Sequence, residues 1–191
     1  MTDSAATPAL PRDDLSAVIK AYDVRGVVGE QIDAPLVREV GAAMACLLRD
    51  ESPDTGVVVV GHDMRPSSPE LSAAFAAGAA DQGADVVTIG LASTDELYFA
   101  SGSLDRPGAM FTASHNPAQY NGIKLCRAGA RPIGQDSGLL EIRDRAEALL
   151  ADLPEDRGRR VPGHPVAGVN DDPQPATGDR REAEQVLRVV L

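Results

Sequence analysis

The chain has 191 residues, of which 43% are hydrophobic and only 3% aromatic, a balance that predicts one domain with an aliphatic core and a tail. The formal net charge is −11, which argues against the basic surface that nucleic acids and anionic membranes require. No apolar run reaches the roughly 18–20 residues of a membrane span, and the polar N-terminus is unlike a signal peptide. The two cysteines, Cys46 and Cys126, lack metal-binding spacing and favour free thiols in a reducing, cytoplasmic setting.

The first half of the chain alternates strand and helix patterns. Residues 1–14 read as a disordered lead, and the segment 15–30 begins with an apolar run suited to a strand. Asp33 is then placed to cap a helix, since a proline follows in the first turn and apolar residues recur at i, i+3, i+4 spacing. The β-branched run in 55–63 predicts a strand buried on both faces.

Two further helices and a strand are expected next. Ser68 is the expected cap of an alanine-rich helix with proline at its first position, and Gly83 is the expected residue just past its end. The apolar run 84–90 predicts another buried strand. Residues 94–102 predict a short helix with Thr94 as its cap.

The last elements surround a serine. Residues 107–113 predict a strand that runs directly into Ser114, and an Asn121-Gly122 turn is expected to open a strand over 121–126. A helix is expected over 136–153. Alternating strands and helices with one hairpin indicate a three-layer α/β/α sandwich with a mixed, mostly parallel sheet.

The composition changes after this helix. The domain is therefore assigned to residues 15–153, and residues 154–191 are expected to form a Pro/Gly/Arg-rich tail with a short terminal helix.

Ser114 is expected just beyond the carboxyl end of a buried strand, where open α/β sheets bind their ligands. Asn116 is followed by proline, which turns the backbone, so the loop should display Ser114, His115 and Lys124. A serine hydroxyl is a poor nucleophile without a base, so the neighbours of Ser114 decide its chemistry.

Three interpretations of Ser114 are open from the residues alone. A Ser-His-Asp hydrolase is disfavoured, because the Gly-x-Ser-x-Gly elbow is absent and the side chains of adjacent residues such as Ser114 and His115 usually diverge. A phosphoserine would need cations and N–H donors, which His115, Lys124 and Arg25 can supply. A structural turn serine is the third interpretation.

The small number of lysines in the chain supports a specific chemical role for Lys124. Of the 18 basic residues only Lys20 and Lys124 are lysines, and one of the two falls in the candidate site. A lysine can exchange a proton where an arginine effectively cannot, which hints at acid–base work at this position.

The stretch "TASHNPAQYNGIK" resembles the phosphoserine loop of the α-D-phosphohexomutases, the phosphomannomutase/phosphoglucomutase family. In addition, "AYDVRGVVGE" is similar to the opening strand and turn of that family. The stretch "VVGHDMRPSSPEL" is similar to its Gly-Arg-Asp-x-Arg-x-Ser-Ser segment, with His62 where arginine is usual. The resemblance covers about residues 15–153 and corresponds to the first of four domains.

The resemblance implies a reaction in which Ser114 carries a transferable phosphoryl group. A hexose 1-phosphate of mannose or glucose would pass through a hexose 1,6-bisphosphate and leave as the 6-phosphate. His115 and Lys124 would assist proton transfer and stabilise charge, Arg25 would contact phosphate, and Tyr22 would line the cleft. The family also implies Mg²⁺, held in part through the phosphate on Ser114.

Other residues of these motifs are expected to shape the loop. Asn116 and Asn121 are assigned to loop shape, and Gly122 is expected to adopt a positive φ. Local hydrogen bonding and helix capping, without catalysis, are expected of Arg65, Ser67 and Ser68.

Three sequence motifs of the family are absent from this chain. The Asp-Gly-Asp-x-Asp metal loop, the Gly-Glu-x-Ser-Gly sugar loop and the Ser/Thr-rich phosphate loop do not occur in these 191 residues. A fragment, a frameshifted product or a natural short form would each look this way, and weak or no activity is expected from the chain alone. The alternative is a catalytically silent domain that binds a sugar phosphate or a partner domain, with self-association through the face that would pack on a second domain.

Overall fold

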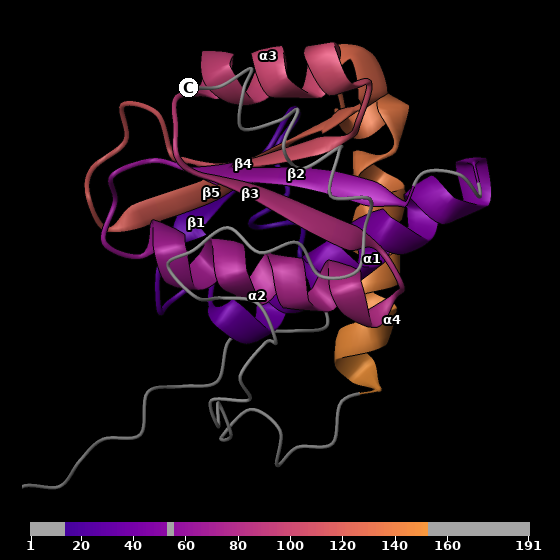
Figure 1. Cartoon of the computed structure of the whole chain (residues 1–191). Helices are drawn as coiled ribbons and strands as arrows, with labels where there is room; N and C mark the ends of the chain where they lie inside the picture. Colours follow the sequence, from indigo (N-terminus) through magenta and orange to yellow (C-terminus); the bar gives the residue numbers. More distant parts are fainter. Residues whose placement is uncertain (1–13, 53–55, 153–191) are drawn as a thin grey trace, which may run out of the picture.

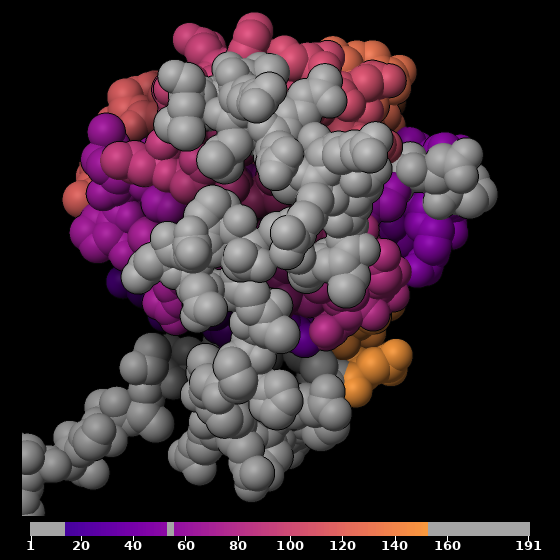
Figure 2. All heavy atoms as spheres, viewed as in Figure 1, coloured from indigo at the N-terminus to yellow at the C-terminus, as the bar shows by residue number. Residues whose placement is uncertain are grey.

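The computed structural model describes residues 14–52 and 56–152, which form a sheet between two layers of helices (Figure 1). Helix α3 covers one face, and α1, α2 and α4 cover the other. In the space-filling view, the residues of α3 lie at the top (Figure 2). The helices are α1 (Ala34–Glu51), α2 (Ser68–Asp81), α3 (Thr94–Leu104) and α4 (Leu139–Ala151). The expected α/β/α architecture is confirmed.

The sheet has six strands in the order β1-β5-β4-β2-β3, with β6 paired to β5. Strand β2 runs parallel to β3 and β4, while β5 is antiparallel to β1, β4 and β6. The sheet is therefore mixed, as expected, but parallel pairing is confined to β2 and its two neighbours, a smaller share than predicted. The strands are β1 (Val24–Val27), β2 (Val57–His62), β3 (Asp85–Leu91), β4 (Gly108–Phe111), β5 (Tyr120–Arg127) and β6 (Arg131–Pro132).

Helix α1 follows directly from its sequence. The carboxylate of Asp33 accepts a hydrogen bond of 2.9 Å from the N–H of Leu36, which satisfies one of the first-turn donors, and Pro35 stands where it loses no helical bond. The apolar side chains at helical spacing, including Val37, Val40 and Met44, are completely buried. Both the cap and the buried face of this helix were correctly indicated by the local pattern.

Two helices have other cap residues than expected. Helix α2 follows Ser67, because the hydroxyl of Ser68 donates to the Asp63 carboxylate at 2.7 Å and does not cap the helix. Helix α3 is capped by Ser93, not Thr94: Ser93 Oγ accepts from the N–H of Glu96, and the Glu96 carboxylate accepts from the N–H of Ser93.

Two strand boundaries also differ. Asn121 and Gly122 do not form a turn, since they lie inside β5 and pair with Gly26 and Arg25 of β1. The apolar run after Asp14 forms a turn, and the first strand begins only at Val24. The predicted lead over 1–14, apart from Asp14, and the predicted tail over 154–191 with its terminal helix lie outside the described residues.

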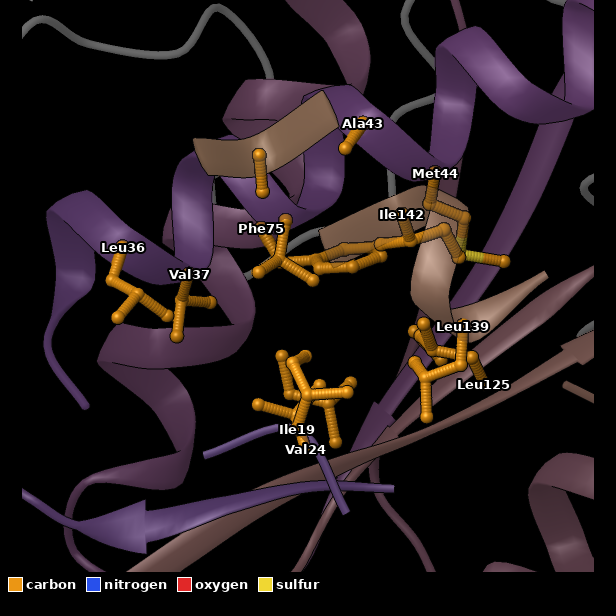
Figure 3. Close-up of a cluster of buried hydrophobic side chains, with 14 of the residues drawn as sticks. Ile19, Val24, Leu36, Val37, Ala43, Met44, Phe75, Leu125, Leu139 and Ile142 are labelled. Atoms are coloured by element: carbon orange, nitrogen blue, oxygen red, sulfur yellow. The ribbon is translucent and has the colours of Figure 1, made fainter. Parts of the chain in front are cut away.

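The larger of the two hydrophobic clusters lies between the sheet and helices α1, α2 and α4 (Figure 3). Phe75 of α2 packs edge-on against Phe111 of β4, with ring centroids 5.7 Å apart. A smaller cluster under α3 includes Leu97 and Met110. The core is otherwise aliphatic, and burying each large side chain contributes about 1.5–3 kcal/mol.

None of the helices in the described ranges has the length and hydrophobicity to span a lipid bilayer.

Candidate active site

Ser114 lies in an exposed loop that follows β4 at one edge of the sheet. Strand β4 ends beside its parallel neighbour β2, and the N–H of Asp63 donates to the carbonyl of Phe111 at 2.9 Å. The carboxyl ends of two parallel strands therefore meet directly below the Ser114 loop, in the position that α/β sheets use for ligands.

The backbone of Ser114 adopts φ 54°, in the left-handed region. This conformation costs a non-glycine residue about 1–2 kcal/mol and tends to occur where function requires it. The N–H of Ser114 donates to Thr112 Oγ1 at 3.0 Å, and Ser114 Oγ lies 3.4 Å from His115 Nδ1. The adjacent histidine thus reaches the hydroxyl, contrary to the expected divergence of neighbouring side chains. No carboxylate of the described residues is bonded to His115, so this pair lacks the third member of a hydrolase triad.

Arg25 and Lys124 gather around one carboxylate. Lys124 Nζ lies 3.6 Å from Asp23 Oδ2, and Arg25 Nη2 donates to the same oxygen. The Asp23 side chain is 9% exposed, whereas those of Arg25 and Lys124 are 26% and 27% exposed. The sequence identified the two cations but missed Asp23, whose signal was its alternation with Arg25 along one strand face.

Two tyrosines are neighbours of Asp23, one directly before it in the chain and one on α3. Tyr22 is 78% exposed, and its ring lies close to Gly134. Tyr98 of α3 is half-buried, and burial, with smaller contributions from Cys126 and Asp23, raises the pKa of its phenol. Tyr98 was not expected here, since its position within a helix carries no local sign of proximity to Asp23.

The predicted site residues therefore form two groups. Ser114 contacts His115, and Arg25 contacts Asp23 together with Lys124. Within the part of the chain that the structure describes, no hydrogen bond joins Ser114 Oγ to Arg25 or Lys124. The Nε of Arg25 is buried and has no acceptor among these residues, so part of its hydrogen-bonding capacity is unused.

A buried polar network supports the loop from below. The side-chain amide of Asn121, which is fully buried, donates to Ser67 Oγ and Ser68 Oγ at 2.9 Å each. Ser68 in turn donates to Asp63, and Asn121 Oδ1 accepts from the N–H of Gly122 at 2.8 Å. Asn121 thus ties the start of β5 to the start of α2.

Asp63 is the acceptor at the centre of this network. Burial alone would raise the pKa of its carboxyl group, but hydrogen bonds from the Arg65 N–H, Ser68 and Thr112, with the positive charge of Arg65, outweigh burial and lower that pKa. The Asp63 carboxylate is therefore ionised and fully engaged at neutral pH.

Gly122 is required for a different reason from the one expected. Its φ is not positive; a Cβ at this position would lie 2.4 Å from the carbonyl oxygen of Val24 and 3.1 Å from that of Thr112. The absence of a side chain lets β1 and the end of β4 approach β5 closely.

Arg65 makes more contacts with the loop than any of the predicted site residues. Its Nη1 donates to the carbonyls of Pro117 and Tyr120, its Nη2 to those of Ser114 and Asn116, and its Nε to Asp63. The four carbonyl contacts measure 2.8–2.9 Å, and the Arg65 side chain is only 10% exposed. Local hydrogen bonding was expected of Arg65, but these partners are 49–55 residues away and no local pattern reveals them.

The described residues do not form a metal site by themselves. In the ranges 14–52 and 56–152, no group of three or more histidine, cysteine or carboxylate side chains is placed to hold an ion. The donor set expected for Mg²⁺ is therefore not met by this part of the chain.

Comparison with known proteins decides the family. The family model for the phosphoglucomutase/phosphomannomutase alpha/beta/alpha domain I matches residues 16–151. The chain belongs to this family. The resemblance seen in the Ser114 loop motif is thereby confirmed, as is the fold.

Individual relatives agree. The chain is 48% identical over 133 residues to the phosphohexose mutases of Xanthomonas campestris pv. campestris (strain B100), covering 69% of this chain and 29% of the relative. It is 43% identical over 129 residues to a phosphomannomutase of Vibrio cholerae serotype O1, covering 67% and 28%. A crystal structure of a phosphoglucomutase/phosphomannomutase family protein from Burkholderia thailandensis matches with a TM-score of 0.64 and 34% identity, covering 74% and 31%. The chain spans less than a third of each of these three proteins.

Proposed function

We propose that this domain carries a phosphoryl group on Ser114 and takes part in the interconversion of hexose 1-phosphate and hexose 6-phosphate. The observation that supports this most is the exposed Ser114 hydroxyl, held at a strained φ beyond β4 and 3.4 Å from His115 Nδ1, in a chain of this family. The names of the relatives, phosphomannomutase and phosphohexose mutase, favour mannose or glucose phosphates as substrates. A cytoplasmic location is part of the same proposal.

In each half of the proposed reaction one phosphoryl group is transferred. One proton leaves the attacking hydroxyl, and one proton is delivered to the departing oxygen. A sugar hydroxyl attacks the phosphorus of phosphorylated Ser114, the bond from phosphorus to Ser114 Oγ breaks, and a bisphosphate forms. His115 Nδ1 returns a proton to the departing Oγ, because it is the ring nitrogen nearest that oxygen. Lys124 Nζ, as the neutral amine, accepts the proton that the sugar hydroxyl loses, and the resulting ammonium and the charge of Arg25 stabilise the phosphate. The second half runs in reverse with the sugar phosphate turned around.

Magnesium is proposed as the cofactor of the complete enzyme, where it would neutralise charge on the phosphate oxygens. The phosphate on Ser114 would be one ligand, and the carboxylate ligands would have to come from outside the described residues. No step above depends on the metal.

The alternative is a domain that holds a sugar phosphate or a partner domain without turnover. It is favoured by the lack of a carboxylate cluster for Mg²⁺ among the described residues. Precise placement of reactants can contribute about 7–11 kcal/mol to lowering a barrier, so a chain without the other domains would lose most of its rate. Self-association through the face expected to pack on a second domain belongs to this alternative.

Incubation with ³²P-labelled glucose 1,6-bisphosphate, followed by intact-mass and peptide analysis, tests the proposal. We expect label on Ser114 in the wild-type chain and none in Ser114→Ala, while Ser103→Ala, an exposed serine of α3, serves as the matched control. A wild-type chain without label would contradict the phosphoryl-carrier function. Label without formation of glucose 6-phosphate in a coupled assay with Mg²⁺ would support the domain without turnover.

A further inference from the structure

The four carbonyl oxygens bound by Arg65 determine which way the Ser114 loop faces. They belong to Ser114, Asn116, Pro117 and Tyr120, and all converge on one guanidinium group. We call this arrangement the Arg65 clamp. With the bond to Asp63, the clamp uses every N–H of the Arg65 side chain, so the guanidinium is fully satisfied and held in one orientation.

The clamp also determines the direction of the loop amides. The described peptide bonds are all trans, and in a planar trans peptide the N–H of the next residue points away from the carbonyl. The N–H groups of His115 and Ala118 follow two of the clamped carbonyls and therefore point away from Arg65. Neither N–H has an acceptor among the described residues. The loop thus turns carbonyl oxygens inward and free donors outward.

From this geometry we propose that Arg65 is a positioning residue for the phosphoryl group on Ser114, an inference that rests on the function proposed above. By drawing the carbonyls inward, Arg65 removes the negative ends of four peptide dipoles from the surroundings of a phosphate dianion. It leaves the N–H groups of His115 and Ala118 to face the phosphate oxygens, as in other backbone sites for anions. Arg65 itself does not touch the phosphate, because all its donors are occupied.

Only a guanidinium suits this role. A lysine at this position would keep the charge, but its three donors sit on a single nitrogen and cannot reach four carbonyls spread over seven residues. Arg65→Lys is therefore expected to resemble Arg65→Ala. Comparing the two variants distinguishes the effect of the planar guanidinium donors from the effect of the positive charge.

The first test measures amide hydrogen exchange of the wild-type chain, Arg65→Ala and Arg65→Lys. Asn116 and Tyr120 donate their N–H groups to carbonyls within the loop, so their exchange reports its order. Losing hydrogen bonds to a charged group should speed this exchange by about tenfold or more in both variants. Methylguanidinium should restore protection in Arg65→Ala alone. The control is Arg127→Ala, a guanidinium bound to Glu51 and to the Ser137 carbonyl at the far end of β5.

The second test compares labelling of Ser114 by hexose 1,6-bisphosphate. The maximal rate should fall by about 100-fold in Arg65→Ala with little change in the bisphosphate concentration at half-maximal rate, since small misplacements cost rate more than binding. Arg127→Ala should label like the wild type.

The outcomes are separable. Unchanged loop exchange in both variants would overturn the clamp, whatever the labelling shows. Faster exchange with a wild-type labelling rate would overturn the positioning role. A wild-type chain that takes no label would instead overturn the proposed function, and the exchange data would then judge the clamp alone. If Arg65→Ala does not fold, as shown by circular dichroism, Arg65→Lys and Arg65→Gln carry the same two measurements.

Discussion

Asp23, which directly precedes β1, and Lys124 of β5 form an ion pair, with the lysine nitrogen 3.6 Å from an aspartate oxygen. The same carboxylate also binds Arg25, so one nearly buried anion holds two partly exposed cations in place. The cations are thereby kept close together without a bound anion, although like charges repel. A phosphate that reaches Arg25 and Lys124 must compete with Asp23 for them.

The first prediction is that Asp23→Asn lowers the free energy of unfolding by about 1–3 kcal/mol, because two cations lose their common partner. Inorganic phosphate should bind the variant more tightly, since both cations are then available. Urea unfolding with and without phosphate measures both effects. Asp81→Asn, which removes the exposed partner of Arg38, should cost under about 1 kcal/mol. Equal losses in the two variants would refute the special position of Asp23.

The second prediction concerns close packing at Gly122. Gly122→Ala should destabilise the domain by about 3 kcal/mol, because the added methyl group would meet the backbone of both neighbouring strands, which cannot move aside. Gly56→Ala is the control: a Cβ there has no neighbour within 4 Å and Gly56 has no positive φ. Thermal unfolding compares the two, and a neutral Gly122→Ala would contradict the observed strand geometry.

The third prediction follows from the strained backbone of Ser114. Ser114→Gly should be more stable than Ser114→Ala by about 1 kcal/mol, since only glycine adopts a positive φ without a steric cost. Neither variant should accept phosphate. Chemical denaturation of the two variants side by side gives the difference, and equal stability would mean that the loop relaxes when the hydroxyl is removed.

The fourth prediction is a pH dependence through Asp63. Its pKa is lower in the folded chain than its ordinary value of 3.8, so the folded state stabilises the ionised form. This contribution to stability is complete above that value and is lost as the pH falls below it toward the folded pKa. The difference in urea midpoint between the wild type and Asp63→Asn should therefore shrink as the pH is lowered through this range. A constant difference would show that Asp63 acts only through packing and neutral hydrogen bonds.

Local sequence patterns correctly predicted the elements that neighbouring residues specify. The periodicity and the Asp33 cap of α1 are properties of neighbouring residues, and so are the runs that form β2 and β3. The Asn121-Gly122 pair misled because its turn propensity is overridden by pairing with β1 and by the buried contacts of Asn121 with α2. The cap of α2 differs by one residue for a related reason, since the Ser68 hydroxyl donates to Asp63.

Sequence motifs also indicated the candidate site, but not how it is held. Ser114, His115, Arg25 and Lys124 were singled out, and the structure places them in two groups on neighbouring strands and loops. Asp23 and Arg65, which hold those groups, depend on contacts between distant segments. In the sequence alone, nothing distinguishes these two residues from other charged residues that form ion pairs.

Because Arg65 binds the loop through main-chain oxygens alone, its contacts do not depend on the exposed side chains between Pro117 and Tyr120. Ala118 and Gln119, both exposed, are free to change in related proteins without altering the backbone that presents the hydroxyl. Arg65 cannot be replaced in the same way, because only a guanidinium can bind the four carbonyls. The exposed surface of the loop can therefore vary while the backbone that presents the Ser114 hydroxyl keeps its shape.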